Sequence, residues 1–409
     1  MGPNIFSPSV SRSLSDDTFV LEAGWVLDGT GSPVQEALFI GVHKGMIVSL
    51  GDTCPSWLQR HDVMDLSGST VMPGLVDCHV HLFMSGAEEA AVRSRQLAFT
   101  FPEARPVIEA HLRQHLRHGV VAVRDGGDYG GHALRYRNEV LSGAGVPVHV
   151  RCAGRAWRAS GRYGTLIGRP PANGQTLAES IALRDENTDH VKIVNSGLNS
   201  LRVFARETPP QFSLEELTEA AGAAKTLGLR TMVHANGRLP VTIAVKAQCD
   251  SVEHGYFMGG DALAMMAEHR IFWVPTAFTM QAYAECAAAG SVERSVAERN
   301  LNAQLAQLAR ARAESVAVAV GTDCGSLGVH HGSSFARELG LLIEAGFSAE
   351  EAVRCATLNG ATLLGLDKEL GRLDVGMPAT FVVIKGSPRT LAEGLQSVQR
   401  VYVRGERVV

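Results

Sequence analysis

Short apolar runs alternate with long helical stretches through the middle of this 409-residue chain. The runs that we interpret as eight strands are GLVDCHVHL, VVAVRDGG, VPVHVRCAG, HVKIVNSG, LRTMVHANG, CDSVEHGYF, IFWVPTAF and VAVAVGTDCG. The stretches FSLEELTEAAGAAKTLG and SVERSVAERNLNAQLAQLARARAES lie between them and have the period of amphipathic helices. Strand–helix alternation predicts a parallel sheet covered by helices, and eight units predict a closed (β/α)8 TIM barrel of the α/β class.

The two ends of the chain follow a period of two residues. Residues 18–70 contain β-prone runs broken by Gly, Pro and Asp, and residues 371–409 alternate apolar and polar side chains in the same way. Because neither end can make a core alone, we expect them to pair into one small β-sandwich beside a barrel of residues 71–370. Residues 1–17 are Ser-rich and predict a disordered tail. Residues 151–190, with clustered Gly, Arg and Pro, predict one long loop after the third strand.

Composition and charge narrow the class of function. Apolar residues make up 45% of the chain and charged residues 20%, which is typical of globular proteins. The formal net charge of -4 offers no general attraction for nucleic acid or anionic lipid. No apolar run reaches the roughly 18 residues that a membrane span requires, and the first residues lack the pattern of a secretory signal. We therefore expect a cytoplasmic homo-oligomer that acts on a small molecule and binds neither nucleic acid nor membrane.

Polar side chains recur toward the carboxyl ends of the predicted strands. His79 and His81 lie two residues apart in GLVDCHVHL, so on a strand both imidazoles point to the same face and can reach one ion. Later strands carry Lys192, His234, His254 and Asp323 at the equivalent place. Burying any one of these groups among Val, Ile and Ala costs several kcal/mol unless it is paired or metal-bound. A neighbour could satisfy each of them singly, but their repetition over five strands predicts a shared metal site.

The seven cysteines are scattered along the chain. They are Cys54, Cys78, Cys152, Cys249, Cys286, Cys324 and Cys355. Their odd number and irregular spacing predict neither a disulfide framework nor a zinc knuckle. Cys78 and Cys324 stand beside candidate ligands but occupy the opposite strand parity, which favours core packing over metal binding.

The order of these motifs resembles the amidohydrolase superfamily over nearly the whole chain. The resemblance is carried by VMPGLVDCHVHL, by the strand-borne Lys192, His234 and His254, and by GTDCG, which holds Asp323. The closing segment AVRCATLNGATLLGLDKELGRLDVGMPATFVVIKG looks like the last barrel helix of these enzymes running into their small β-sandwich. The lysine in HVKIVNSG is similar to that of the binuclear branch, which includes prolidase-like dipeptidases and related amidases.

This resemblance implies a binuclear metal centre with Asp323, Lys192 and His254 as catalytic residues. Lys192, carboxylated by carbon dioxide, would bridge two divalent ions as a carbamate. The first ion would be held by His79, His81, Lys192 and Asp323, and the second by Lys192, His234 and His254. Nitrogen and oxygen donors suit Zn, with Mn, Co or Fe as alternatives. A bridging hydroxide would attack, Asp323 would act as general base and acid, and the second metal would polarise the carbonyl. A protonated Lys192 paired with Asp323 is the alternative to the carbamate.

Three classes of function remain open on this basis. The first is hydrolysis of an amide-type C–N bond in an N-acyl amino acid, a dipeptide or a related amide. The second is opening of a cyclic amide or imidazolone, or deamination of a heterocycle, at a site with one metal. A deaminase needs a Glu near the fifth strand, and MVHANGR has none. The third, a barrel that only binds, is disfavoured because all the ligand positions are occupied by suitable residues.

The substrate is constrained less than the metal site. Prolidase-like relatives commonly carry a Tyr two residues after the fifth-strand histidine and a Gly-Gly-His-Gly run after the third strand. Here those places hold Asn236 and Gly161-Arg162-Tyr163-Gly164, which argues against plain dipeptide specificity. Tyr163 and Asn236 are candidates for orienting a carbonyl.

Arginines cluster in the predicted long loop, and they are Arg155, Arg158, Arg162 and Arg169. A guanidinium can bind a carboxylate with two parallel hydrogen bonds, so a carboxylate-bearing substrate is one prediction and a solvated loop is the other. Trp157 either packs on the substrate or fixes this loop to the barrel rim. His330, beside His331, is a candidate pocket residue, with an exposed histidine pair as the alternative.

Overall fold

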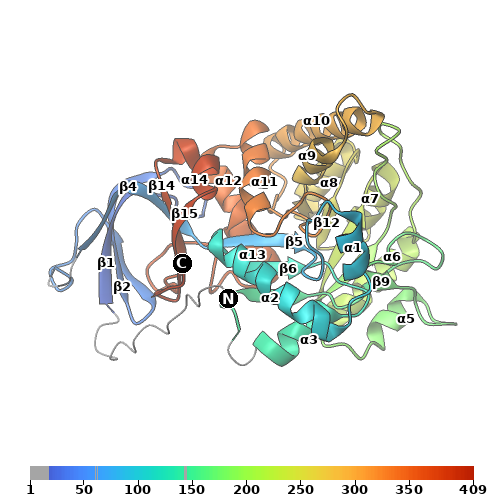
Figure 1. The fold of residues 1–409 in the computed structure, drawn as a ribbon, viewed down its shortest axis with the longest axis horizontal. Coiled ribbons are helices and arrows are strands. Elements are labelled where there is room, and N and C mark those ends of the chain that lie inside the picture. The colour runs from blue at the N-terminus through green and yellow to red at the C-terminus, as the bar shows by residue number, and fades with distance from the viewer. Residues whose placement is uncertain (1–17, 60, 62, 142–144) are drawn as a thin grey trace.

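The two ends of the chain meet in one seven-stranded sheet (Figure 1). The computed structural model describes residues 18–59, 61, 63–141 and 145–409, so the predicted tail of residues 1–17 lies outside the described residues. The sheet has the order β16-β15-β14-β4-β1-β2-β3. Its strands are β1 (Thr18–Val26), β2 (Gln35–His43), β3 (Met46–Gly51), β4 (Val63–Pro73), β14 (Phe381–Lys385), β15 (Val398–Val403) and β16 (Glu406–Arg407). This pairing defines a single sheet and does not show the two-sheet sandwich that the sequence predicted.

This sheet has a core of its own. Antiparallel pairing of β4 with β14 joins the two ends of the chain, and Leu21, Ile40, Val71 and Phe381 pack in one apolar cluster. Alternating side chains supply this cluster because successive residues of a strand point to opposite faces. The boundaries predicted near residues 70 and 371 stay a prediction.

Parallel strands and helices alternate through the rest of the chain, which confirms the α/β class (Figure 1). One sheet has the order β5-β6-β7, and the other has the order β13-β12-β11-β10-β8-β9. The strands are β5 (Leu75–Val80), β6 (Val120–Asp125), β7 (His149–Cys152), β8 (Ala156–Trp157), β9 (Gly168–Arg169), β10 (His190–Val194), β11 (Arg230–Ala235), β12 (Ser251–His254) and β13 (Phe272–Val274). The hydrogen bonds therefore define two parallel sheets, where the sequence predicted one closed sheet.

The eighth predicted strand, VAVAVGTDCG, is not a regular strand in the structure. Isolated parallel bridges join Trp273 to Val318 and Val80 to Cys324, so the segment lies between β13 and β5 and links the two sheets. A Cβ atom added at Gly321 would lie 2.4 Å from a methyl group of β13. Gly321 thus permits the segment to lie close to β13. The backbone of the segment is irregular, and this irregularity interrupts the hydrogen-bond ladder between the strands.

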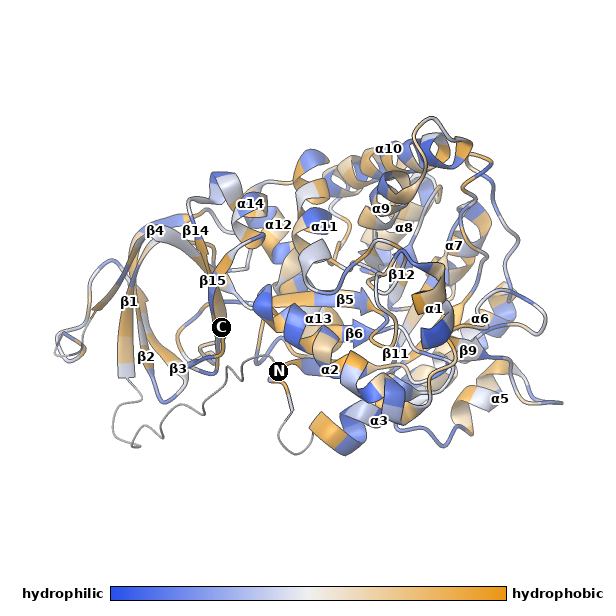
Figure 2. Ribbon diagram, in the orientation of Figure 1, coloured by the Kyte–Doolittle hydropathy of each residue, from blue (hydrophilic) through white to orange (hydrophobic). Residues whose placement is uncertain are grey.

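Helices pack outside the parallel strands. They are α1 (Ala90–Gln96), α2 (Phe101–Arg117), α3 (His132–Tyr136), α5 (Leu177–Ala182), α6 (Leu214–Thr226), α7 (Arg238–Lys246), α8 (Gly260–His269), α9 (Phe278–Cys286), α10 (Val292–Ala313), α11 (Ser333–Glu344), α12 (Ala349–Ala356), α13 (Leu358–Leu364) and α14 (Leu391–Leu395). Figure 2 shows apolar residues along β5 and a mixture of polar and apolar residues on outer helices such as α10. None of the helices in the described part of the chain is long and apolar enough to cross a membrane.

The predicted long loop of residues 151–190 contains regular structure. Trp157 on β8 pairs with Ile193 on β10, and Thr176 begins α5 with a capping box that it shares with Glu179. The prediction of one loop was therefore wrong. The elements here are only two to six residues long, and the Gly, Pro and Arg residues between them hide any strand or helix period in the sequence.

Candidate metal centre

A cavity of about 270 Å³ lies where β5, β10, β11 and β12 converge. Its lining includes all of the predicted metal ligands, which are His79, His81, Lys192, His234, His254 and Asp323. Tyr163 and Asn236 line the same cavity. The structure therefore brings together residues that are up to 244 positions apart in the chain, as their equivalent places on parallel strands imply.

Two imidazoles and one carboxylate converge at one side of the cavity. The Nε2 atoms of His79 and His81 each lie 3.4 Å from Oδ1 of Asp323. Nδ1 of His81 donates to the backbone oxygen of Gly127 at 2.9 Å, so its Nε2 carries a lone pair and no proton. Nδ1 of His79 donates to a carboxylate oxygen of Glu253 at 2.8 Å, which leaves its Nε2 in the same state.

Burial keeps both rings neutral. It lowers the pKa of His79 well below its usual value and that of His81 to about 4. Two lone pairs therefore face an oxygen of Asp323, and all three groups are acceptors when that carboxyl is ionised. Such an arrangement is repulsive by itself, whereas a divalent cation among the three would satisfy them together. The donor set thus fits a metal ion.

Glu253 supports this site from behind, and sequence analysis missed it. The side chain is fully buried on β12; Oε2 accepts from His79, while Oε1 accepts from Arg124 at 2.8 Å and from Ser251 at 2.6 Å. A carboxylate on the outer nitrogen of a metal-binding histidine fixes the tautomer and the ring orientation. The one signal in the sequence was an acidic residue inside the apolar run SVEH.

His234 and His254 form the other side of the cavity, with ring centroids 4.6 Å apart. The ring of His254 also lies 4.9 Å from that of His79, and its Nδ1 is 2.7 Å from Oγ1 of Thr276. Nε2 of His234 donates to the backbone oxygen of Gly197 at 3.2 Å, so its Nδ1 carries the lone pair. These two histidines offer a second set of nitrogen donors beside the first.

Lys192 is buried and lines the same cavity as the two sets of histidines. The side chain is 1% exposed, and its Nζ has no hydrogen-bond partner among the described residues. Burial lowers the pKa of Lys192 to about 8. The alternative of a direct Lys192–Asp323 ion pair is not formed in the structure. A buried amine without a partner is costly, so the position fits a group that is paired with something bound there.

Asp323 has a backbone φ of 58°, in the left-handed region. Its N–H donates to the backbone oxygen of His79 at 2.7 Å, and its Oδ2 accepts from Oγ of Ser326 at 3.1 Å. Burial raises the pKa of this carboxyl to about 7. A strained backbone held by specific hydrogen bonds is a common feature of functional sites.

The predicted substrate-binding residues divide into two groups. The Tyr163 ring lies 5.5 Å from that of His234, and Oδ1 of Asn236 accepts from the N–H of Tyr256 at 3.1 Å. The four other candidates do not line the cavity. They are Arg155, Arg158, Arg162 and His330. Nε of Arg155 donates to Glu186 at 2.7 Å, Arg158 donates to the backbone oxygen of Ala159, and Arg162 donates to that of Pro209. His330 lines a separate pocket near α11.

Trp157 fixes the arginine-rich segment and does not line the cavity. It is 5% exposed, and the guanidinium of Arg169 lies 4.8 Å from its ring. Arg169 and Arg155 both pair with Glu186. These two arginines of the predicted loop are therefore paired with a carboxylate of the protein itself.

Arg93 is a cationic residue of the cavity that sequence analysis missed. Nη1 of Arg93, on α1, donates at 3.1 Å to the backbone oxygens of Ser85 and Gly325. Its Nε and Nη2 make no hydrogen bond to the described residues and remain available to a ligand. Apolar side chains complete the lining, among them Phe83, Leu97, Leu166, Leu198, Leu201 and Met280. Helix α1 lies outside the strand pattern, so no signal in the sequence pointed to Arg93.

Known proteins match the chain over most of its length. The model of the amidohydrolase family matches residues 70–408. Ochratoxinase from Aspergillus niger is 25% identical, over 90% of this chain and 81% of that protein. Imidazolonepropionase from Aliivibrio salmonicida is 24% identical, over 86% of each. A Xaa-Pro dipeptidase solved with bound methionine superposes with a TM-score of 0.81 and 26% identity, over 95% of this chain and 99% of that one. The chain therefore belongs to the amidohydrolase family and is a hydrolytic enzyme that acts on carbon–nitrogen bonds.

Proposed function

We propose that this enzyme hydrolyses the amide bond of a small, carboxylate-bearing molecule at a binuclear metal centre. The single observation that carries the proposal is the convergence of unprotonated Nε2 atoms of His79 and His81 on the carboxylate of Asp323. The neighbouring His234 and His254 add a second pair of donors, and Lys192 lines the same cavity with an Nζ that has no hydrogen-bond partner among the described residues.

Each ion has a set of residues to hold it. His79, His81 and Asp323 would hold one divalent ion, and His234 and His254 would hold the other. Lys192 would be carboxylated by carbon dioxide, with loss of a proton, and its carbamate would supply oxygen ligands; this reaction would replace a buried amine that has no hydrogen-bond partner among the described residues. Zn suits these nitrogen and oxygen donors, with Mn, Co or Fe as alternatives. We further propose that the two parallel sheets, linked by residues 316–325, are the walls of a (β/α)8 barrel.

The protein's own groups would carry the proton transfers. Bound divalent ions would lower the pKa of a water toward neutrality and polarise the substrate carbonyl. Asp323 would accept the proton of the attacking water and deliver it to the leaving nitrogen. Its hydrogen bond from Ser326 holds one carboxylate oxygen in place, so the other stays directed toward His79 and His81. Tyr163 and Asn236 would orient the substrate carbonyl beside His234.

The cavity wall supports a substrate with a carboxylate next to an apolar group. Arg93 provides unused N–H donors, and the leucines around it provide apolar surface. A guanidinium with two free N–H groups suits a carboxylate. N-acyl amino acids and dipeptides have this combination. Arg93 thus takes the place that the sequence prediction gave to Arg155, Arg158 and Arg162.

Opening of a cyclic amide is the second candidate, because imidazolonepropionase is among the relatives. It requires only one ion. Glu253, which is buried on β12 beside β11, is hydrogen-bonded to His79 and Arg124 and is not free to act as a deaminase acid.

Metal content and a substrate panel separate the two functions. Metal-loaded enzyme would be tested on N-acyl amino acids, dipeptides and cyclic amides, with carboxylate-amidated analogues as controls. We expect close to two ions per chain at the centre formed by His79, His81, Lys192, His234, His254 and Asp323, and turnover that depends on the free carboxylate. Saturation near one ion with full activity confined to cyclic amides would contradict the proposal. The proposal also includes a cytoplasmic location and a homo-oligomeric state.

A further inference from the structure

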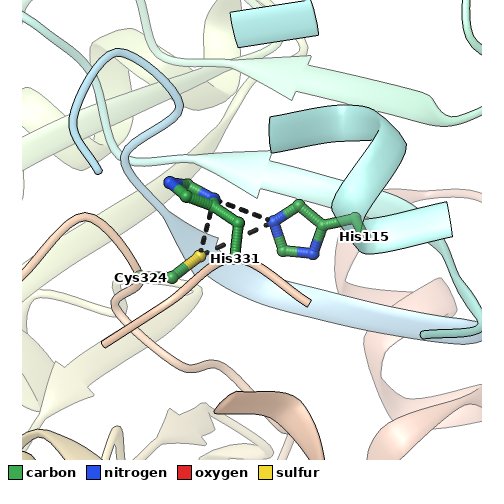
Figure 3. Close-up of side chains that lie close together, drawn as sticks. All are labelled: His115, Cys324 and His331. Atoms are coloured by element: carbon green, nitrogen blue, oxygen red, sulfur yellow. Dashed lines mark hydrogen bonds between the residues drawn. The ribbon is translucent and has the colours of Figure 1, made fainter. Parts of the chain in front are cut away.

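A second cluster of donor atoms lies away from the cavity, among buried side chains. It consists of His115 on α2, Cys324 in the segment that links the two sheets, and His331 just before α11 (Figure 3). All three residues are at most 2% exposed. We call them the sulfur cluster. None of the three lines the cavity of the metal centre.

The three donor atoms of the sulfur cluster are mutually close. Sγ of Cys324 lies 3.1 Å from Nδ1 of His331 and 3.6 Å from Nε2 of His115, and the two nitrogens are 3.1 Å apart. A point equidistant from atoms with these separations lies roughly 1.9 Å from each, and slightly farther when it is raised from their plane. Zn–N and Zn–S bonds are about 2.0–2.1 Å and 2.3 Å. The triangle therefore already has the size of a metal-ligand set.

In one tautomer of His115, two donors of the sulfur cluster face a single nitrogen acceptor. Nε2 of His331 lies 2.7 Å from the backbone oxygen of Met84, so it carries the proton and Nδ1 presents a lone pair to the cluster. Both the thiol of Cys324 and an N–H at Nε2 of His115 would compete for that one lone pair. Nδ1 of His115 is buried without a partner among the described residues. With the proton on Nδ1 instead, Nε2 of His115 offers a lone pair beside that of His331 and the sulfur of Cys324, so the three atoms can act together as ligands of one ion.

We propose that His115, Cys324 and His331 bind a thiophilic ion, Zn²⁺ or Cu⁺, at a second site distinct from the catalytic centre. One thiolate and two neutral imidazoles suit both ions. Binding forms the S–metal bond, and the thiol proton leaves to solvent when the site is filled. The ion joins α2 to the segment that follows Asp323 and so fixes the backbone on which Asp323 stands. The sequence favoured core packing over metal binding for Cys324, and the proposed site assigns it the second of these roles.

Cobalt substitution tests this site with a readout that the catalytic centre does not give. Protein would be produced in cells supplied with Co²⁺, so that the ion enters before the buried site closes. A thiolate on Co²⁺ gives a charge-transfer band in the near ultraviolet, whereas nitrogen and oxygen donors do not. We expect this band in the unaltered protein, its loss in Cys324→Ser, and a fall of about one ion per chain in total metal.

Cys355→Ser is the matched control, because Cys355 is also a buried free thiol but lies outside the sulfur cluster. It should keep the band and the metal content. His115→Gln is the second variant, and its band should be shifted or lost even if Cys324→Ser does not fold. Protein loaded with Cu⁺ in place of cobalt would identify the copper form of the site. X-ray absorption should show a sulfur atom bound to copper, and this sulfur should be lost in Cys324→Ser. Absence of the band in cobalt-loaded unaltered protein with no sulfur-bound copper would overturn the proposal.

Discussion

Asp323 and Cys324 are neighbours in sequence, yet they serve two different environments. Asp323 faces the cavity with His79 and His81, and its side chain is 14% exposed. Cys324 faces the opposite way, is fully buried, and meets His115 and His331. On our proposals, one short segment would supply an oxygen donor to the site in the cavity and a sulfur donor to the buried site.

The two environments differ in their exposure to solvent, and this difference suits one to a catalytic role and the other to a structural role. Water and substrate can enter the cavity side, where the donors also leave room for a ligand. The three residues of the sulfur cluster are at most 2% exposed, so an ion bound there would have a structural role. The predictions below test the cavity side of this comparison.

The largest effect should come from Asp323→Asn. An amide cannot accept the proton of the attacking water, and loss of a general base commonly costs roughly 10²- to 10⁴-fold in rate. We expect kcat to fall by this amount with a small change in the melting temperature. Kinetics with a responsive substrate and thermal melts on the same samples measure both; near-native turnover would remove Asp323 from the mechanism.

The next effect should come from Glu253→Gln, which acts through His79. Gln keeps the shape but loses the charge that orients the ring and pairs with Arg124. Removing such a supporting carboxylate typically lowers metal affinity or activity by about 10- to 100-fold. Competition with a chelator measures the affinity. Ser251→Ala is the control that leaves the carboxylate in place, and equal affinity in Glu253→Gln and the unaltered enzyme would contradict the role of Glu253.

A smaller and more selective effect should follow Arg93→Ala. Loss of a charge-assisted hydrogen bond of about 1.5–3 kcal/mol should raise KM for carboxylate substrates by roughly 10-fold or more, with kcat little changed. Amidated analogues should be unaffected. Arg155→Ala, which removes a loop arginine paired with Glu186, should leave KM near its original value. A KM that responds to Arg155 and not to Arg93 would restore the arginine-rich loop as the substrate site.

The sequence predicted that the side chains of the candidate ligands come together because period and place on a strand are local properties. His79 and His81 share a face by spacing alone, and Lys192, His234 and His254 follow from their position in apolar strands. Asp323 was predicted as well, although its segment is held by isolated bridges and not by a regular ladder. Arg93, Glu253 and the sulfur cluster depend on which distant elements pack together, and no local pattern encodes such contacts. The arginines of the loop were attractive by charge, but their partners, such as Glu186, become visible only in the fold.

The central claim is that Lys192 bridges two ions as a carbamate, and removal with chemical rescue tests it most directly. Lys192→Ala should lose metal and activity together, because both ions lose a shared anionic ligand. Acetate or propionate should then restore part of both by occupying the vacated space, whereas Asp323→Asn treated in the same way should stay inactive. A Lys192→Ala enzyme that keeps two ions and its turnover, or a crystal of active two-metal enzyme with density ending at a bare Lys192 ammonium, would contradict the account.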